Sequence, residues 1–113
     1  MKNNYDEETY NIRLELEKTV LDWPDIIPKK MFGHHCYQSN RKLFAFIEPN
    51  SIVITKLSQT ERENIPKKYE TTHYQTENRN IKNWIRFPIE NIDDINNIIP
   101  YMEKSYESTY SRK

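Results

Sequence analysis

Apolar and polar residues follow different periodicities along the chain, and these predict short helices and strands in succession. Residues 5–23 are rich in Glu, Leu and Lys, which favour a helix, and Pro24 marks the end of this segment. Tyr10, Leu14 and Leu21 share one face of the expected helix. Apolar residues in this segment also alternate as they would in a strand, but propensity and length favour the helix.

The next stretch, residues 29–56, predicts a three-stranded antiparallel meander. The expected strands are residues 31–38, 43–47 and 52–56. Ser39-Asn40 supplies the first turn, because Asn tolerates a left-handed backbone. Pro49-Asn50 supplies the second turn and suits the two central positions of a type I turn.

The second half of the chain predicts a helix, two strands and a final helix. Ser58 and Glu61 form a capping box, so a short helix is expected as far as residue 65. Strands are expected at residues 69–75 and 84–89, with a polar loop at 76–82 between them. The last helix has an apolar stripe with helical spacing, formed by Ile92, Ile95, Ile99, Met102 and Tyr106. Pro100 is tolerated best in a first turn, which predicts a start near Asn97.

Together these elements predict an α+β fold in the order α-β-β-β-α-β-β-α. We expect a mainly antiparallel five-stranded sheet with helices on one face. A chain of 113 residues is the size of a single domain, residues 1–113, with frayed ends at 1–4 and 110–113.

The expected core centres on the strand at residues 43–47. Phe44 and Phe46 should point to the same side of it, because side chains alternate along a strand. Residues of the tryptophan strand and of the last helix should pack with them, namely Trp84 or its neighbours Ile85 and Phe87, with Ile95, Ile99 and Met102. The other side of the strand is apolar too, so a loop or a second subunit is expected to cover it.

Composition and charge exclude several classes of protein. The formal net charge is +0, which argues against a nucleic-acid surface. The N-terminus has no apolar signal-peptide core, and no apolar run is long enough to span a membrane. A single cysteine permits no internal disulfide, which fits a reducing compartment. We therefore expect a cytoplasmic protein with no membrane contact.

The cluster His34-His35-Cys36 is the main concentration of reactive side chains. In a strand, His34 and Cys36 share one face and His35 takes the other, so a metal would need a further ligand such as His73. A nucleophilic Cys36 with His34 as its base would also need an oxyanion hole. We predict no metal site, no cofactor and no catalytic residues. A half-buried strand explains the cluster best.

Two residues of the tryptophan strand are candidates for partner contact. Trp84 and Arg86 share one face of that strand, and both residue types are common at interface hot spots. Core packing is the alternative for Trp84. Our candidate ligand or partner contacts are therefore His34, Cys36, Trp84 and Arg86.

Several motifs, in order, resemble the N-terminal domain of the TfoX/Sxy family. They are KMFG at residues 30–33 followed by Cys36, LFAFI at 43–47, TKLS at 55–58, KNWIRFP at 82–88 and Ser105-Tyr106. The resemblance covers roughly residues 23–109. The chain departs from the family pattern at Ser39-Asn40, where a glycine is usual, and at residues 77–80. The YjbR-like group also ends in a tryptophan strand and a similar helix, but KMFG and LFAFI favour TfoX.

This resemblance implies an α+β fold related to the YjbR-like and secretion-chaperone-like folds. Long members of the family regulate competence for DNA uptake and carry a second, helical domain that has no counterpart in these 113 residues. We therefore do not carry over their regulatory role, and the family supplies no catalytic residues to transfer.

Two classes of function follow from these observations. The first is a non-enzymatic interaction or regulatory module with a protein partner, for which we hypothesise a homodimer because an open sheet has exposed edges. The second is a small-molecule or metal-binding protein that uses the sheet face around His34 and Cys36. An aromatic apolar patch would favour the first, whereas a convergent pocket beside Cys36 with shifted pKa values would favour the second.

Overall fold

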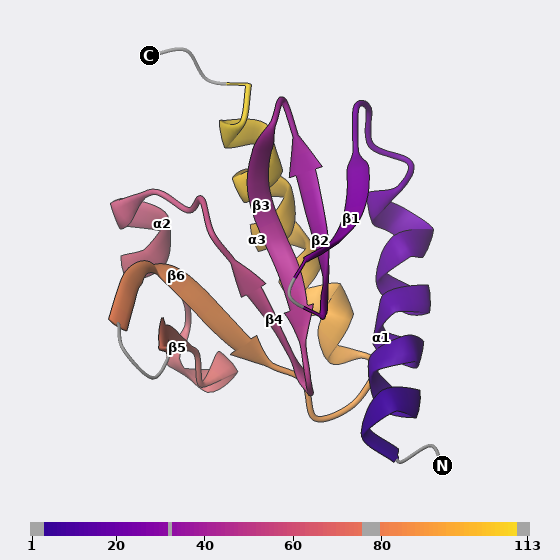
Figure 1. The fold of residues 1–113 in the computed structure, drawn as a ribbon. Coiled ribbons are helices and arrows are strands. Elements are labelled where there is room, and N and C mark those ends of the chain that lie inside the picture. The colour runs from indigo at the N-terminus through magenta and orange to yellow at the C-terminus, as the bar shows by residue number, and fades with distance from the viewer. Residues whose placement is uncertain (1–3, 32, 76–79, 111–113) are drawn as a thin grey trace.

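Helices and strands follow one another along the chain and build one sheet with helices behind it (Figure 1). The computed structural model describes residues 4–31, 33–75 and 80–110. In chain order the elements are α1 Asn4–Val20, β1 Ile27–Met31, β2 His34–Ser39, β3 Lys42–Glu48, β4 Ser51–Ile54, α2 Gln59–Glu63, the 3-10 helix η1 Lys67–Tyr69, β5 Thr72–Gln75, β6 Asn80–Pro88 and α3 Asp94–Ser108.

The sheet is antiparallel throughout, as the sequence predicted, and its strand order is β1-β2-β3-β4-β6-β5. The described residues form six strands, so the prediction of five was wrong. The extra strand arises at Gly33, whose φ of 82° makes the turn of a hairpin. Ile27–Met31 pairs with β2 across this turn, so the sixth strand lies mainly in residues before the expected strand at 31–38, which corresponds to β2.

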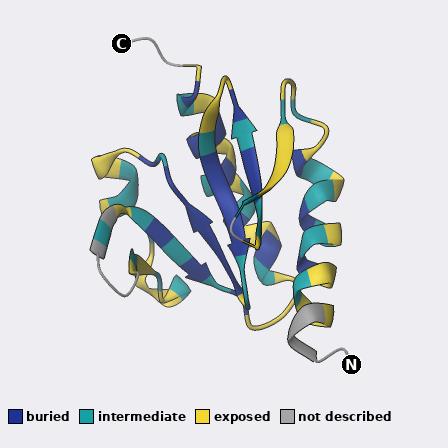
Figure 2. Ribbon diagram, viewed as in Figure 1, coloured by how far each residue is buried: buried dark blue, intermediate teal, exposed yellow. Residues whose placement is uncertain are grey.

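Both long helices pack on the same face of the sheet, which confirms the α+β layer arrangement. α3 passes behind β2 and β3 in Figure 1, and α1 lies beside it. Burial is concentrated in β3 and β4, at the centre of the sheet (Figure 2). None of the helices in the described part of the chain is long and apolar enough to cross a lipid bilayer.

The buried side of α1 is not the one that the apolar pattern suggested. Ile12, Leu16 and Val20 form the buried stripe, whereas Tyr10 and Leu14 are 52% and 45% exposed. Both stripes are apolar and both fit the helical period, so periodicity alone does not select between them. The packing of α1 against the sheet and α3 makes the selection.

Helix α3 begins at Asp94, earlier than the expected start near Asn97, and Pro100 lies inside it. The Asp94 carboxylate accepts hydrogen bonds from the backbone N–H groups of Glu90 at 2.9 Å and Asn91 at 3.1 Å. These bonds hold the start of the helix in place. Pro100 is exposed, so water can reach the carbonyl that its missing N–H leaves without a helical partner.

A β-bulge in β3 changes the side of the sheet to which one of its side chains points. Tyr37 pairs with Ala45 and Gln38 pairs with Leu43, so Phe44 is an extra residue in β3. Phe44 therefore packs on the helical side, while Phe46 packs on the opposite side. The prediction that Phe44 and Phe46 share a face was wrong, because the alternation of side chains is interrupted between them.

The main core forms where Phe44 meets the helices. Its ring lies 5.5 Å from the ring of Tyr106 and 6.5 Å from that of Trp23, measured between centroids. Ile85, Phe87, Ile95 and Met102 join this core as predicted, and Ile99 packs partly buried against it. Trp84 and Phe46 belong to a separate cluster on the other face.

The local signals near the turns and ends are confirmed in part. Ser58 and Glu61 make both hydrogen bonds of the capping box. Asn40 is left-handed with φ 52°, as expected, but Asn50 has φ 58°, which excludes a type I turn. The expected frayed ends lie largely outside the described residues, yet Tyr110 is anchored by a 2.9 Å hydrogen bond to Asp25.

The facing of α1 predicts opposite outcomes for two neighbouring leucines. Leu16→Ala should lower the free energy of unfolding by about 2–5 kcal/mol, because it empties a fully buried site. The control Leu14→Ala, on the exposed side of the same helix, should change it by less than about 0.5 kcal/mol. Urea titrations of both variants measure this difference, and equal losses would contradict the orientation of α1.

The bulge predicts a large penalty for shortening Phe44. Phe44→Ala should cost about 3–5 kcal/mol, since a fully buried ring that contacts two other aromatic rings is lost. Thermal and urea unfolding measure the loss. A variant as stable as the unmodified chain would show that Phe44 does not lie in the core.

Candidate functional site

The four candidate contact residues lie together on the side of the sheet that faces away from α1 and α3, which we call the open face. Cys36 pairs with Phe46, and both belong to the cluster on this side. Trp84 belongs to the same cluster, and Arg86 pairs with the cluster residue Val53. The structure thus brings β2 and β6 residues onto one surface, although β3 and β4 separate the two strands.

An aromatic cluster, made of His34, Phe46, Tyr74 and Trp84, occupies the middle of the open face. The ring of Phe46 lies at its centre, with centroids 5.5 Å from His34, 5.4 Å from Tyr74 and 5.8 Å from Trp84. Phe46 is buried, whereas the three surrounding rings are each partly exposed. The rings therefore fill this face and present their outer edges to solvent.

A charged pair borders the aromatic cluster. Arg86 Nε lies 3.5 Å from Glu48 Oε1, and the Tyr74 hydroxyl donates a hydrogen bond to the same carboxylate. Burial, and then the neighbouring Glu48 carboxylate, raise the pKa of Tyr74 above its ordinary value, so the hydroxyl stays protonated and donates. Glu48 thereby links β3, β5 and β6 across the open face.

Cys36 sits under the cluster in a setting that suppresses its reactivity. Its thiol donates to the backbone carbonyl of His34 at 3.5 Å, while the His34 imidazole contacts the Phe46 ring. Burial raises the pKa of Cys36 above its ordinary value. A nucleophilic cysteine needs the opposite shift, so this arrangement does not activate the thiol.

The structure does not bring His73 to His34 and Cys36. His73 lies on β5, at the far edge of the sheet, with β3, β4 and β6 between β5 and β2. Across residues 4–31, 33–75 and 80–110, no three or more His, Cys, Asp or Glu residues are grouped to hold a metal ion.

Sequence reasoning missed two parts of the open face and one other group of residues. Glu48 and Tyr74 were not among the candidates, although Glu48 follows Phe46 at the strand spacing that signals a shared face. His35 points to the helical side of the sheet and approaches Arg13 and Lys30. Only the fold brings Arg13, Lys30 and His35 together, because they come from α1, β1 and β2, respectively.

Comparisons with known proteins leave the family open. Searches against protein-family models, curated proteins and solved structures find no match for this chain. The resemblance to the TfoX N-terminal domain stays a prediction that depends on its motifs.

The environment of Cys36 predicts slow alkylation. Iodoacetamide should label native Cys36 far more slowly than it labels the urea-unfolded chain, because the thiol is buried and its pKa is raised. The native rate should still be rising at about pH 9, since the thiolate forms only above the ordinary pKa. Mass spectrometry follows the reaction. Rapid labelling that levels off near neutral pH would instead identify an activated cysteine.

Proposed function

We propose that the protein is a non-enzymatic interaction module, resembling the N-terminal domain of competence regulators, and that its open face binds a second copy of the same chain. The observation that carries this proposal is the partly exposed aromatic cluster on the face of the sheet opposite α1 and α3. Aromatic residues and arginine are the types enriched in the centres of protein interfaces. Trp84, Tyr74 and Arg86 all contribute to this surface.

The edges of the sheet favour pairing through the face rather than through an edge strand. Pro28, Lys29 and Lys30 lie on the edge strand β1, and proline and lysine are residues that discourage edge-to-edge pairing. The other edge strand, β5, spans only 4 residues. The homodimer that we hypothesise from the sequence is therefore proposed with its contact on the open face.

The charges on and around this face suit a self-complementary contact. A twofold-symmetric interface buries the same patch from both copies, so the patch must carry both signs of charge. Arg86 and Glu48 supply them side by side. The formal net charge of +0 also means that two copies do not repel each other at long range.

The setting of Cys36 supports an activity without catalysis. Its raised pKa and its position beneath the aromatic cluster disfavour a nucleophilic role. His34 and Cys36 line two different hollows and no described hollow is lined by both, which disfavours the alternative of one ligand site around this pair. A single thiol in the chain is in keeping with a cytoplasmic location, which we propose on the same grounds.

Charge reversal at Arg86 tests the proposed dimer. Sedimentation equilibrium should show a reversible dimer, and Arg86→Glu should raise its dissociation constant at least roughly tenfold, because two carboxylates then meet on each copy. The double variant Arg86→Glu with Glu48→Arg should restore the affinity. Lys104→Glu, an equal change of charge on the exposed side of α3, should leave it unchanged.

Two results would contradict this proposal. One is a chain that stays monomeric at every concentration tested. The other is a dimer that responds equally to Arg86→Glu and to Lys104→Glu, which would place the contact elsewhere or make it nonspecific.

A further inference from the structure

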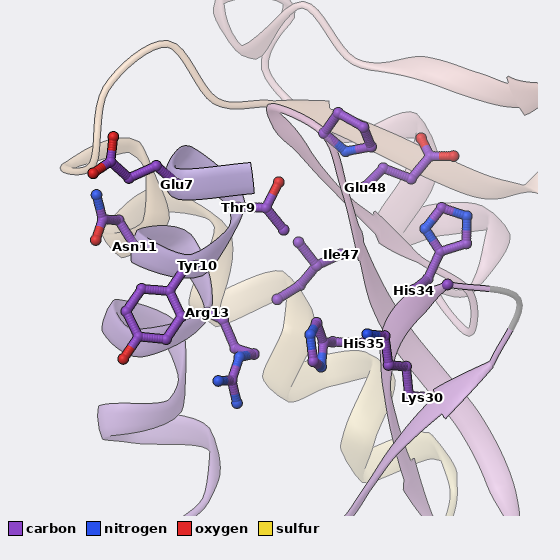
Figure 3. A pocket seen from close by; sticks show the side chains of 12 residues that line it. Glu7, Thr9, Tyr10, Asn11, Arg13, Lys30, His34, His35, Ile47 and Glu48 are labelled. Carbon is purple, nitrogen blue, oxygen red and sulfur yellow. The ribbon is translucent and has the colours of Figure 1, made fainter. Parts of the chain in front are cut away.

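A cleft of about 590 Å³ separates the first turns of α1 from the β1–β2 hairpin and the end of β3 (Figure 3). Clefts that bind small molecules commonly have volumes of about 300–1,000 Å³. The lining comes from four elements, so the cleft exists only in the folded chain. Most of it lies on the helical side of β2, and His34 of the aromatic cluster and Glu48 of the open face border it.

Three nitrogen-bearing side chains converge at one end of the cleft. Lys30 and His35 are directly opposite each other in the β1–β2 ladder, so their side chains share a face, and Arg13 approaches from α1. The same three residues line an adjoining hollow of about 190 Å³. Arg13 and Lys30 carry positive charge, and His35 adds to it when protonated. We call these three residues, which both spaces share, the cationic group.

The protein itself neutralises this group only in part. Arg13 Nη1 makes one long ion pair, 3.5 Å from Glu17 Oε1, and its guanidinium carbon lies 5.6 Å from the centre of the Tyr10 ring, which leaves most of its N–H donors for a ligand. In the described part of the chain, no ion pair joins Lys30 to a carboxylate. Burial, and then the positive charges of Arg13 and Lys30, lower the pKa of His35, while Glu17 opposes them. An anion bound here would relieve this repulsion.

The other end of the cleft offers a hydroxyl and an apolar wall. Thr9 projects from α1 into the space between that helix and β3 (Figure 3). Its Oγ1 is buried and has no hydrogen-bond partner within the described structure. Ile47 supplies apolar surface beside it. Glu7 and Glu48 also line the cleft, and their charges disfavour an extended polyanion.

We propose that this cleft binds a small organic anion, whose oxyanion group contacts Arg13, Lys30 and His35 and whose body extends toward Thr9 and Ile47. The arginine fork and the lysine ammonium recognise carboxylate and phosphate groups alike. The mixed charge of the rim restricts the ligand to a compact molecule. The three groups that contact the oxyanion lie on the opposite face of β2 from the proposed dimer contact, while His34 and Glu48 border both surfaces.

Titrations followed by ¹⁵N–¹H NMR test the site with two simple probes. Sulfate represents a phosphate group and acetate represents a carboxylate, each added at constant ionic strength with sodium chloride. Either probe should shift the amide signals of Arg13, Lys30 and His35 in a saturable way. The probe that saturates at the lower concentration identifies the oxyanion class.

Two variants and a matched control locate the binding. Arg13→Gln and Lys30→Gln should each weaken binding roughly tenfold, the effect of losing one charge-assisted contact. Lys104→Gln removes an equal charge from α3 and should have no effect. Lys30 is exposed on an edge strand, so Lys30→Gln tests the site even if Arg13→Gln disturbs α1.

The dependence of sulfate binding on pH provides an independent readout. The charged groups that face His35 are Arg13 and Glu17 from α1 and Lys30 from β1. Because burial and the neighbouring cations lower the pKa of His35 below its ordinary 6.5, this side chain is more positively charged in acidic solution than at about pH 8. Sulfate should bind more tightly at about pH 5.5 than at about pH 8, and His35→Gln should remove that difference.

Three results would overturn the proposal. Shifts that never saturate, or that fall equally on exposed lysines such as Lys104, would indicate nonspecific ion binding. Saturable binding that is unchanged in both Arg13→Gln and Lys30→Gln would place the anion elsewhere.

Discussion

The two faces of the sheet carry separate clusters of packed side chains, and this separation depends on the extra residue, Phe44, in β3. In an unbroken strand, Phe44 and Phe46 would compete for one side of the sheet. The bulge moves Phe44 to the helical side, where it contacts Trp23 and Tyr106, and leaves Phe46 at the centre of the open face. One strand therefore supplies the central ring of both clusters.

The bulge is maintained by hydrogen bonds as well as by packing. The Phe44 carbonyl accepts from Ser105 Oγ at 2.8 Å and from the Thr55 backbone N–H at 3.1 Å. Ser105 is fully buried, and its hydroxyl also accepts from the Lys56 backbone N–H at 3.0 Å. A buried carbonyl without partners would be costly, so this serine of α3 helps to make the irregular strand tolerable. The position of helix α3 and the direction of the side chains in β3 thus depend on each other.

Strand β2 connects the two proposed binding surfaces. His34 and Cys36 contribute to the open face, whereas His35 and Tyr37 point toward α1. The Tyr37 hydroxyl donates to Glu17 at 2.7 Å, which fixes β2 against the helix whose Arg13 lines the cleft. Adjacent residues of one short strand therefore serve a protein contact on one side and an anion cleft on the other. Glu48, which lines the cleft and pairs with Arg86, lies where the two surfaces approach each other.

Local chemistry in the sequence was sufficient to predict the α+β class, the antiparallel pairing, the capping box at Ser58 and a common face for His34 and Cys36. These features follow from short-range periodicity, turn residues and caps, which act within a few residues. Tertiary structure alone decided which apolar stripe of α1 is buried, that Ile27–Met31 adds a strand before the turn at Gly33, and that Phe44 leaves the alternation of β3. It also brought Arg13, Lys30 and His35 together. Local arrangements such as these are nearly equal in free energy, and contacts between elements distant in sequence decide which one forms. The local sequence pattern therefore does not predict the outcome.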